Sequence, residues 1–367
     1  MNMKTHAAVL YQPNTPMVIE ELDLQEPSDG EVLVKISAAG VCHSDYHVMK
    51  GEWSSPLPVV LGHEGAGVVE RVGTGVKNVK VGDHVILNFR PNCGWCGHCV
   101  RGQPVLCNGS ETPRNEMFTG GSRMSLRGKT VHHFARTSCF SEYAVVQESG
   151  AVPVRHDMPL DKAALIGCSV MTGVGAVINT ARVEPGSSVV VLGCGGVGLN
   201  CVQGALLAGA DKIIAVDIKQ NKLDYAREFG ATDVINSSNQ DPIAVIHELT
   251  GGGADFAFEA LGRAETIEQA YESIRPGGKA VVVGMAPEED KIAINALSLP
   301  RNEKILMGSY YGSARPWIDL PRLVDLYLSK RLRVDELVTR TYSLEEINDA
   351  YEALAQGDVA RSIIVFD

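Results

Sequence analysis

The distribution of apolar and polar residues divides the chain into two parts with different sequence patterns. Across roughly the first 150 residues, short β-branched runs at 32–36, 67–72 and 84–87 are separated by Gly, Pro and Asp. Short strands with frequent turn residues between them are typical of a compact β-rich or barrel-like domain. We therefore predict such a domain in the first part of the chain.

After Pro185 and Gly186, apolar runs alternate with amphipathic stretches. This alternation predicts a doubly wound parallel sheet with helices packed against it, the α/β fold class. The tail adds two predicted helices and a closing strand. The predicted strands lie at 188–192, 212–216, 233–235, 255–260, 279–284 and 362–366, and the two tail helices lie around 320–330 and 344–356.

Length and composition narrow the class of protein. A chain of 367 residues is longer than one hydrophobic core usually grows, so we expect two domains. The net charge of −11 argues against a nucleic-acid partner, which needs a concentrated basic surface. We see no apolar run of about 18 residues and no signal-peptide pattern in the first ten residues, so we expect no membrane partner and a cytoplasmic location.

Four of the nine cysteines form the most informative motif of the chain. Cys93, Cys96, Cys99 and Cys107 lie within fifteen residues, and C-x2-C spacing lets one turn of backbone supply two ligands to a tetrahedral metal. Disulfides would require a secreted protein. An iron–sulfur cluster is the other alternative, but the seven residues before Cys107 and the Asn after it depart from the bacterial ferredoxin run. We predict a structural zinc site.

A glycine-rich turn follows the predicted strand 188–192. It has the order G-x-G-x-x-G, which binds a dinucleotide when it lies between a strand and a helix. The outer glycines allow a tight turn and close packing, the middle one lets a pyrophosphate approach, and the helix N-terminus attracts the phosphates. The turn consists of Gly193, Cys194, Gly195, Gly196, Val197 and Gly198.

Asp217 ends the next predicted strand and sets the expected cofactor. A carboxylate there accepts hydrogen bonds from the adenosine ribose hydroxyls and repels a 2′-phosphate, so we predict NAD in preference to NADP. Lys222 could support the same ribose; the alternative is an ordinary solvated helix lysine.

Further metal ligands are available outside the four-cysteine motif. The candidates are Cys42, the pair His63 and Glu64, and Cys168. Each alone has a structural interpretation, because buried cysteine acts as a small hydrophobe and a lone histidine is more often structural than a ligand. Sequence spacing does not join them.

Taken together, these motifs resemble the zinc-dependent, medium-chain alcohol dehydrogenase family. The resemblance rests on G-H-E-x2-G at 62–67, the four-cysteine segment, the Gly193 turn and the final Arg361 to Phe366, and it covers essentially the whole chain. It implies a GroES-like β-rich catalytic domain at 1–172, a Rossmann NAD-binding domain at 173–310, and a return to the catalytic domain at 311–367.

The resemblance also implies roles for particular residues. Cys42, His63 and Cys168 match the ligands of a catalytic zinc, which gives two zinc ions per chain. Glu64 matches an acid that can approach this metal, and Asp45 matches a carboxylate that orients the ligand histidine. Ser44 would take the proton of the alcohol and pass it through the ribose hydroxyls to His47, since imidazole exchanges protons with solvent near neutral pH. The alternative for His47 is a plain surface histidine.

Other matched positions concern the cofactor and the substrate. His43 and Arg361 match residues near the pyrophosphate, and Thr172 matches one near the nicotinamide. His43 stands where some members have Arg, so a neutral imidazole would hold phosphate less strongly. The positions that line the alcohol cleft carry bulky side chains, although each could equally be ordinary core. They are Trp53, Phe89, Phe134, Met285 and Tyr310.

From these matches we expect a dehydrogenase for primary alcohols, either aromatic or longer-chain. A thiol-dependent formaldehyde dehydrogenase is an alternative, since Cys42-His43 occurs in that branch too, but His47 and Glu52-Trp53 depart from it. A non-catalytic NAD-binding relative is a third hypothesis, although it would not need the ligands, Ser44 and His47. The long segment 108–136 resembles the dimeric members, so we expect a homodimer, with a tetramer as the alternative.

Overall fold

The computed structural model describes residues 3–357 and 360–366, and the chain divides into two compact units. The first unit contains Met1–Cys168 and Arg315–Asp367, and the second contains Ser169–Ala314. The sequence placed these boundaries after 172 and after 310. The chain thus leaves the first unit once and returns to it for its tail.

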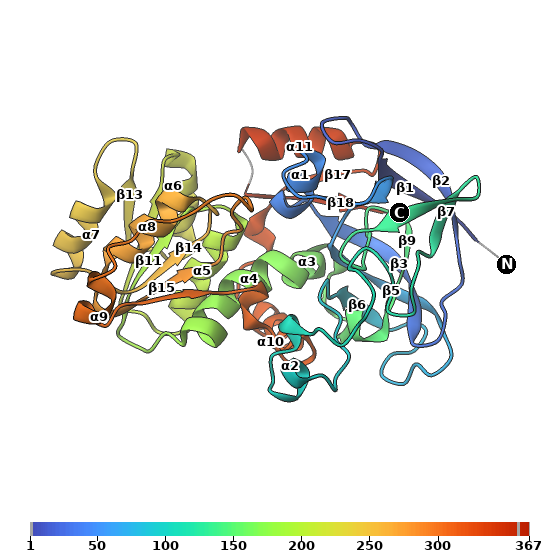
Figure 1. The fold of residues 1–367 in the computed structure, drawn as a ribbon, viewed down its shortest axis with the longest axis horizontal. Helices are drawn as coiled ribbons and strands as arrows, with labels where there is room; N and C mark the ends of the chain where they lie inside the picture. Colours follow the sequence, from blue (N-terminus) through green and yellow to red (C-terminus); the bar gives the residue numbers. More distant parts are fainter. Residues whose placement is uncertain (1–2, 358–359, 367) are drawn as a thin grey trace. The chain divides into compact units, whose positions relative to one another are not determined.

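Two β-sheets form the first unit, as the β-rich pattern predicted (Figure 1). One is a closed barrel of five strands in the order β1-β2-β7-β8-β4, and the other has the order β10-β6-β5-β3-β18-β17 with β9 also paired to β3. The barrel strands are β1 (Met3–Leu10), β2 (Val18–Leu24), β4 (Val59–Val60), β7 (Met124–Leu126) and β8 (Lys129–His133). Those of the sheet are β3 (Glu31–Gly40), β5 (Glu64–Val72), β6 (His84–Leu87), β9 (Tyr143–Gln147), β10 (Ala151–Val154), β17 (Val338–Tyr342) and β18 (Arg361–Val365).

Strand β3 lies at the centre of this sheet. Eight of its ten residues are buried, and it pairs antiparallel with β5, β9 and β18. A strand covered on both faces needs apolar residues without strict alternation, which explains the nearly continuous apolar run at 32–36. Strand β18 comes from the end of the chain, so the tail completes the sheet that the first residues begin.

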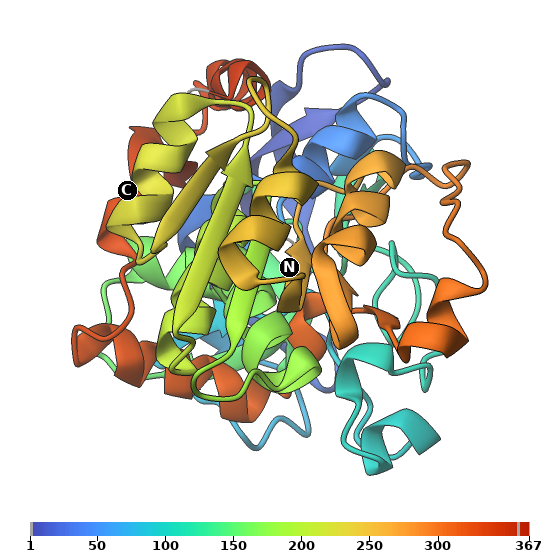
Figure 2. The ribbon, with the colours of Figure 1, turned by 90° about the vertical axis from the view of Figure 1, so that its left-hand side faces the viewer.

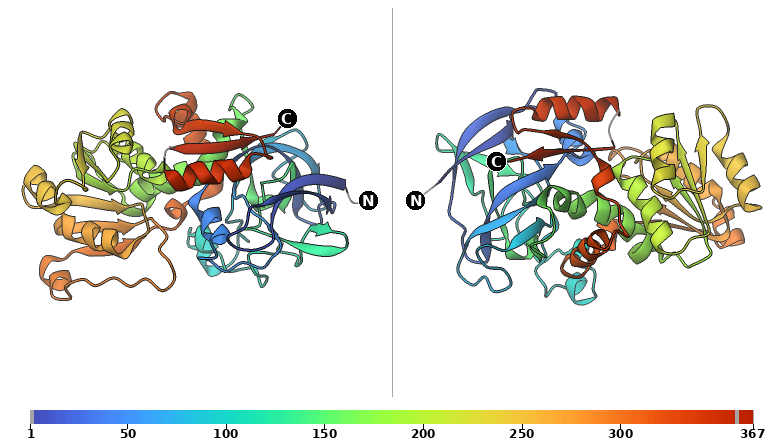
Figure 3. Two further views of the ribbon diagram at one scale, coloured as in Figure 1. Left: turned by 90° about the horizontal axis from the view of Figure 1, so that it is seen from above. Right: turned by 180° about the vertical axis from the view of Figure 1, so that it is seen from behind.

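Helices cover the sheet and connect its strands. In α11 (Ile347–Gln356) the buried residues Ile347, Ala350, Tyr351 and Leu354 recur at helical spacing, which directs one apolar stripe to the core. Figure 3 shows α11 lying beside β18. The other α-helices of this unit are α1 (His43–Met49), α2 (Gly97–Val100), α3 (Leu160–Leu165) and α10 (Pro316–Leu328).

A buried ion pair ties β3 to the turn before β7. The Arg123 guanidinium donates from Nε to Glu31 Oε2 at 2.8 Å and from Nη2 to Glu31 Oε1 at 2.7 Å. Glu31 is fully buried and also accepts from Thr119 Oγ1 and from the amide of Ser28. This network holds the loop at 119–123 against the sheet.

The second unit is the parallel sheet that the alternating pattern predicted. Its order is β13-β12-β11-β14-β15-β16, and every pair is parallel. Figure 2 looks onto these strands and their helices. The strands are β11 (Ser188–Leu192), β12 (Lys212–Asp217), β13 (Asp233–Asn236), β14 (Ala254–Glu259), β15 (Ile274–Val282) and β16 (Ile305–Gly308), and the helices are α4 (Met171–Gly175), α5 (Gly196–Leu207), α6 (Gln220–Glu228), α7 (Pro242–Thr250), α8 (Ala264–Ser273) and α9 (Ser298–Asn302). Strand β16 was not predicted.

One long helical run corrects the expectation that the chain has no apolar stretch of about 18 residues. Leu160–Ala181 is 22 residues long with a mean hydropathy of 1.6, which is enough by length and composition to cross a membrane. However, 83% of its apolar window is buried inside the protein, as in the core helix of a soluble protein. It includes two π-helical segments, Ile166–Val170 and Ala176–Ala181, and such segments are frequent at functional sites.

Candidate functional site

The first unit brings together Cys42, His63, Glu64 and Cys168. Their candidate ligand atoms all lie within 4.8 Å of one another, and all four residues are buried. Cys42 precedes α1, His63 directly precedes β5, Glu64 opens that strand, and Cys168 lies in the first π-helical segment. The three predicted zinc ligands, Cys42, His63 and Cys168, which sequence spacing could not join, are therefore neighbours in the fold. Two thiols and one imidazole are a donor set that fits zinc with an open position.

Asp45 orients the histidine of this cluster. Its Oδ2 lies 3.0 Å from His63 Nδ1, as an ion-pair contact without the alignment of a hydrogen bond, and its Oδ1 accepts from the amide of Gly62 at 2.9 Å. The opposite ring nitrogen, Nε2, lies 3.3 Å from Cys168 Sγ. This arrangement directs Nε2 towards the thiols, as a metal ligand requires.

The residues of the cluster shift one another's pKa values. The hydrogen bond from Cys168 lowers the pKa of the Cys42 thiol well below its usual range, and the same bond together with burial raises the pKa of Cys168. Burial disfavours charge on His63, but Asp45 and the Cys42 thiolate raise its pKa well above the ordinary value. A metal would have to displace these protons when it binds.

Arg361 on β18 pairs with Glu64. Its Nη2 donates to Glu64 Oε2, and both side chains are buried. Burial raises the pKa of Glu64 to about 8, which favours the neutral acid. The pKa of Arg361 is raised by the Glu64 carboxylate in spite of burial, and this effect requires the carboxylate to be ionised. The close contact favours the charged pair. Among the described residues, Glu64 Oε1 has no hydrogen-bond partner, which fits an acid able to approach a metal.

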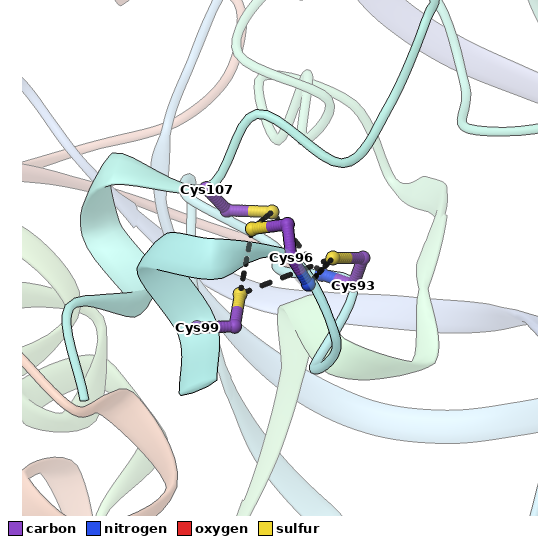
Figure 4. Close-up of side chains that lie close together, drawn as sticks. All are labelled: Cys93, Cys96, Cys99 and Cys107. Atoms are coloured by element: carbon purple, nitrogen blue, oxygen red, sulfur yellow. Dashed lines mark hydrogen bonds between the residues drawn. The ribbon is translucent and has the colours of Figure 1, made fainter. Parts of the chain in front are cut away.

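The four-cysteine segment forms a second cluster between β6 and β7 (Figure 4). Sulfur atoms lie 3.5 Å apart for Cys96 and Cys99, 3.8 Å for Cys96 and Cys107, and 3.9 Å for Cys93 and Cys99. These distances exclude disulfides, whose sulfurs lie about 2 Å apart. A Cβ on Gly109 would lie 2.2 Å from Cys93 Sγ, so the chain needs glycine where it passes the sulfurs. Four converging thiols fit a closed zinc site.

Helix α1 carries the residues predicted to move the alcohol proton. Ser44 and His47 are partly buried, and His43 is exposed. His47 Nδ1 lies 2.5 Å from Glu52 Oε2, and the imidazole stacks on the Trp53 ring at a centroid distance of 4.6 Å. The sequence pattern assigns no role to Glu52. Glu52 lies five residues after His47, and a continuous helix brings together residues three or four apart, so the spacing did not predict this contact.

The glycine turn of the second unit has the geometry that the motif predicted. A Cβ on Gly198 would lie 1.7 Å from the Gly193 carbonyl oxygen, whereas a Cβ on Gly195 would meet nothing within 4 Å. The backbone is thus close-packed behind the turn and open in front of it, as approach of a pyrophosphate requires. Helix α5 starts at Gly196, which together with Val197 opens its first turn.

Asp217 lies at the carboxyl end of β12, beside this turn. Its Oδ2 accepts from the Cys194 amide at 2.9 Å and its Oδ1 accepts from the Lys219 amide at 3.0 Å. The carboxylate is therefore fixed in place before any ligand arrives. Lys222 lies on α6 and Thr172 on α4, both partly buried.

Glu259 is a second residue to which the sequence pattern assigns no role. It is fully buried at the end of β14, where its register partner Leu192 precedes Gly193. Its Oε1 accepts from the amides of Leu261 and Gly262 and from Thr266 Oγ1, so it shapes the turn after β14. No sequence signal identifies it, because a carboxylate at a strand end is ordinary until the strand order is known.

The predicted substrate residues fall in both units. In the first, Phe89 and Phe134 form T-shaped ring pairs with His63 at centroid distances of 5.2 Å and 5.8 Å. In the second, Met285 is 47% exposed and Tyr310 is partly buried ahead of the turn Tyr311–Ser313. The two phenylalanines are thus next to the metal ligands, as a hydrophobic substrate position requires.

Comparisons with known proteins match both parts of the chain. Residues 28–159 match the alcohol dehydrogenase GroES-like domain, and residues 196–329 match the zinc-binding dehydrogenase domain. Two solved structures are 36% identical and cover 100% of both chains: a benzyl alcohol dehydrogenase from Acinetobacter calcoaceticus, with a TM-score of 0.94, and an alcohol dehydrogenase zinc-binding domain protein from Burkholderia ambifaria, with a TM-score of 0.95.

A more distant solved structure has the same fold. An alcohol dehydrogenase from Thermus sp. ATN1 is 27% identical, with 98% of this chain and 99% of that chain covered and a TM-score of 0.83. The two domain matches, the full-length similarity and the two metal-ligand clusters agree. The chain belongs to the zinc-dependent alcohol dehydrogenases of the medium-chain dehydrogenase family.

Proposed function

We propose that this chain is an NAD-dependent alcohol dehydrogenase that interconverts primary alcohols, aromatic or longer-chain, and their aldehydes. The observation that carries the proposal is the buried ligand set of Cys42, His63 and Cys168, with two phenylalanine rings packed T-shaped against the ligand imidazole. The 36% identity to a benzyl alcohol dehydrogenase supports an aromatic substrate in particular.

Each residue of the cluster has a defined task in this proposal. The two thiolates and His63 Nε2 would hold zinc, which when bound supplies a Lewis acid that polarises the alcohol oxygen. Asp45 keeps Nε2 directed at the metal position. Phe89 and Phe134 exclude water beside it. Ser44 accepts the alcohol proton at its hydroxyl oxygen, and His47 passes that proton to solvent.

The second unit supports NAD as the cofactor. The open space at Gly195 can admit a pyrophosphate, and the first turn of α5 presents amide donors to it. Asp217, fixed by two backbone amides, would accept from the ribose hydroxyls and repel a 2′-phosphate. We also infer a homodimer from the length of the segment 108–136.

Reduction of NAD by a panel of alcohols tests the proposal. We expect the highest kcat/KM for benzyl and longer primary alcohols, and we expect NAD to be favoured over NADP by on the order of a hundredfold, or about 2.7 kcal/mol. Asp217→Asn should narrow that preference. Comparable efficiency with both cofactors would contradict the role of Asp217.

Two other results would favour the alternative functions. Formaldehyde turnover that requires an added thiol would favour a thiol-dependent formaldehyde dehydrogenase. Tight NAD binding without turnover of any alcohol would favour a non-catalytic relative. Calorimetry on the preparation used for the activity assay measures the NAD binding.

A further inference from the structure

The end of helix α1 places a carboxylate and an aromatic ring on one histidine. The helix ends at Met49, and Gly51 adopts a φ of +73°, which turns the chain back on itself. The amides of Glu52 and Trp53 then both donate to the His47 carbonyl, at 2.9 Å and 3.2 Å. This turn fixes the two residues beside the imidazole by backbone geometry, independently of their side chains.

The side chains complete the arrangement. Glu52 Oε2 lies 2.5 Å from His47 Nδ1, and the Trp53 ring stacks on the imidazole with an interplanar angle of 23°. Glu52 thus provides a polar contact and Trp53 a ring contact to the His47 imidazole, and Glu52 is the charged one of the two. The other titratable residues of α1 and its C-cap are His43, Asp45, Tyr46 and Lys50, of which Asp45 is buried.

The contact with Glu52 determines which nitrogen of His47 carries its proton. An ionised carboxylate can only accept a hydrogen bond, so Nδ1 must donate and the neutral ring is the Nδ1–H tautomer. Its Nε2 then has a free lone pair. Without the carboxylate the ring would exchange between tautomers, and the Nε2–H form could not accept a proton at that atom.

We propose that Glu52 is a positioning residue for proton transfer, which keeps His47 in the tautomer that accepts at Nε2, while Trp53 holds the ring plane. The inference rests on the proposed function. One proton leaves the alcohol for each hydride transferred; it reaches His47 Nε2 and departs from there to water or a buffer base, because the His47 side chain is 21% exposed. The Nδ1 proton stays on the hydrogen bond to Glu52 throughout, so Glu52 is unchanged by the cycle.

The test compares Glu52→Gln with matched variants. Glutamine keeps the size of the side chain but removes the charge, and it can donate to Nδ1 and so favour the wrong tautomer. The control is Glu142→Gln, since Glu142 forms an exposed carboxylate–histidine pair in this unit, with its Oε2 3.2 Å from His6 Nδ1. Glu52→Asp is the conservative variant that should restore part of the loss.

The kinetic measurement is the transient rate of NADH formation from benzyl alcohol between pH 6 and 9. We expect Glu52→Gln to lower that rate about threefold to tenfold near pH 7, with the loss shrinking as hydroxide takes over at high pH. Because Glu52 acts through His47, the same substitution should cost nothing further in a His47→Gln background, where added imidazole should restore activity. A profile of Glu52→Gln that overlays the parent, or equal losses in both backgrounds, would overturn the inference.

A second measurement does not depend on turnover. Selective ¹⁵N-histidine labelling reports the tautomer of the ring, and loss of one signal in His47→Gln assigns it. The parent should show the Nδ1–H form at His47, and Glu52→Gln should show a mixed or inverted population. If the parent itself showed the Nε2–H form, Glu52 would have no such role. Failure of the parent to oxidise any alcohol, with the tautomer shift intact, would instead reject the proposed function.

Discussion

At the scale of single residues, His133 shows how burial couples this fold to pH. It lies on β8 and is 1% exposed; its Nε2 accepts from the Arg123 amide at 3.2 Å. Burial, with help from the Arg123 and His132 charges, lowers its pKa from 6.5 to about 3. Between these values a proton binds the unfolded chain but not the folded one. The stability from neutral His133 is therefore complete above pH 6.5 and is lost as pH falls towards 3.

His133→Gln gives a direct test, since its Oε1 can still accept from the Arg123 amide while the titrating group is gone. From pH 7 to pH 5, the free energy of unfolding of the parent should fall by roughly 2 kcal/mol relative to this variant, at 1.36 kcal/mol for each pH unit below 6.5. Urea unfolding of both proteins at each pH measures the difference in their free energies of unfolding. Any loss of metal in acid affects both proteins alike and therefore cancels in this difference. Parallel pH dependence would show that His133 is not buried neutral.

At the scale of elements, the Glu31–Arg123 pair should stabilise the junction between β3 and the loop before β7. Glu31→Gln would leave the Arg123 guanidinium buried without a countercharge, and such a change costs roughly 3 to 5 kcal/mol. The matched control is Asp23→Asn, which breaks the exposed pair between Lys4 Nζ and Asp23 Oδ1 and should cost at most about 1 kcal/mol. Equal losses of thermal stability for the two variants in calorimetry would show that the buried pair contributes no more to stability than the exposed one.

The elements also show where sequence information ends. Strands β6 and β11 were predicted with the bounds that the structure has, because each is a dense apolar run between turn residues. Strand β16 was missed because its apolar run, Ile305 to Met307, is only three residues long, and in the structure none of its four residues is buried. The pairing of Glu64 with Arg361 spans 297 residues, and no local periodicity encodes such a contact. Motif spacing alone predicted the four-cysteine cluster, whereas spacing did not join Cys168 to His63, and only the family resemblance grouped these two residues.

At the scale of the whole molecule, two clusters of metal ligands in one unit should have different tasks. The four-cysteine cluster has only thiols and lies in a loop segment with two short helical turns. Because so little regular structure holds this segment, a metal there would contribute to its folding. The Cys42 cluster is buried within a sheet and helix framework, and Glu64 and Arg361 hold a further ion pair beside it. We therefore expect two zinc ions per chain by elemental analysis of freshly purified protein.

Substitution of one ligand in each cluster separates the tasks. Cys42→Ala should remove one zinc and abolish alcohol oxidation while circular dichroism and thermal stability stay close to those of the parent. Cys99→Ala should instead lower thermal stability or soluble yield, and any protein that remains folded should keep the zinc at Cys42, His63 and Cys168. Metal analysis and activity on the same samples distinguish these results. If both variants lost activity only in proportion to unfolding, the metals would not differ in role, since a catalytic ligand must be removable without loss of the fold that surrounds it.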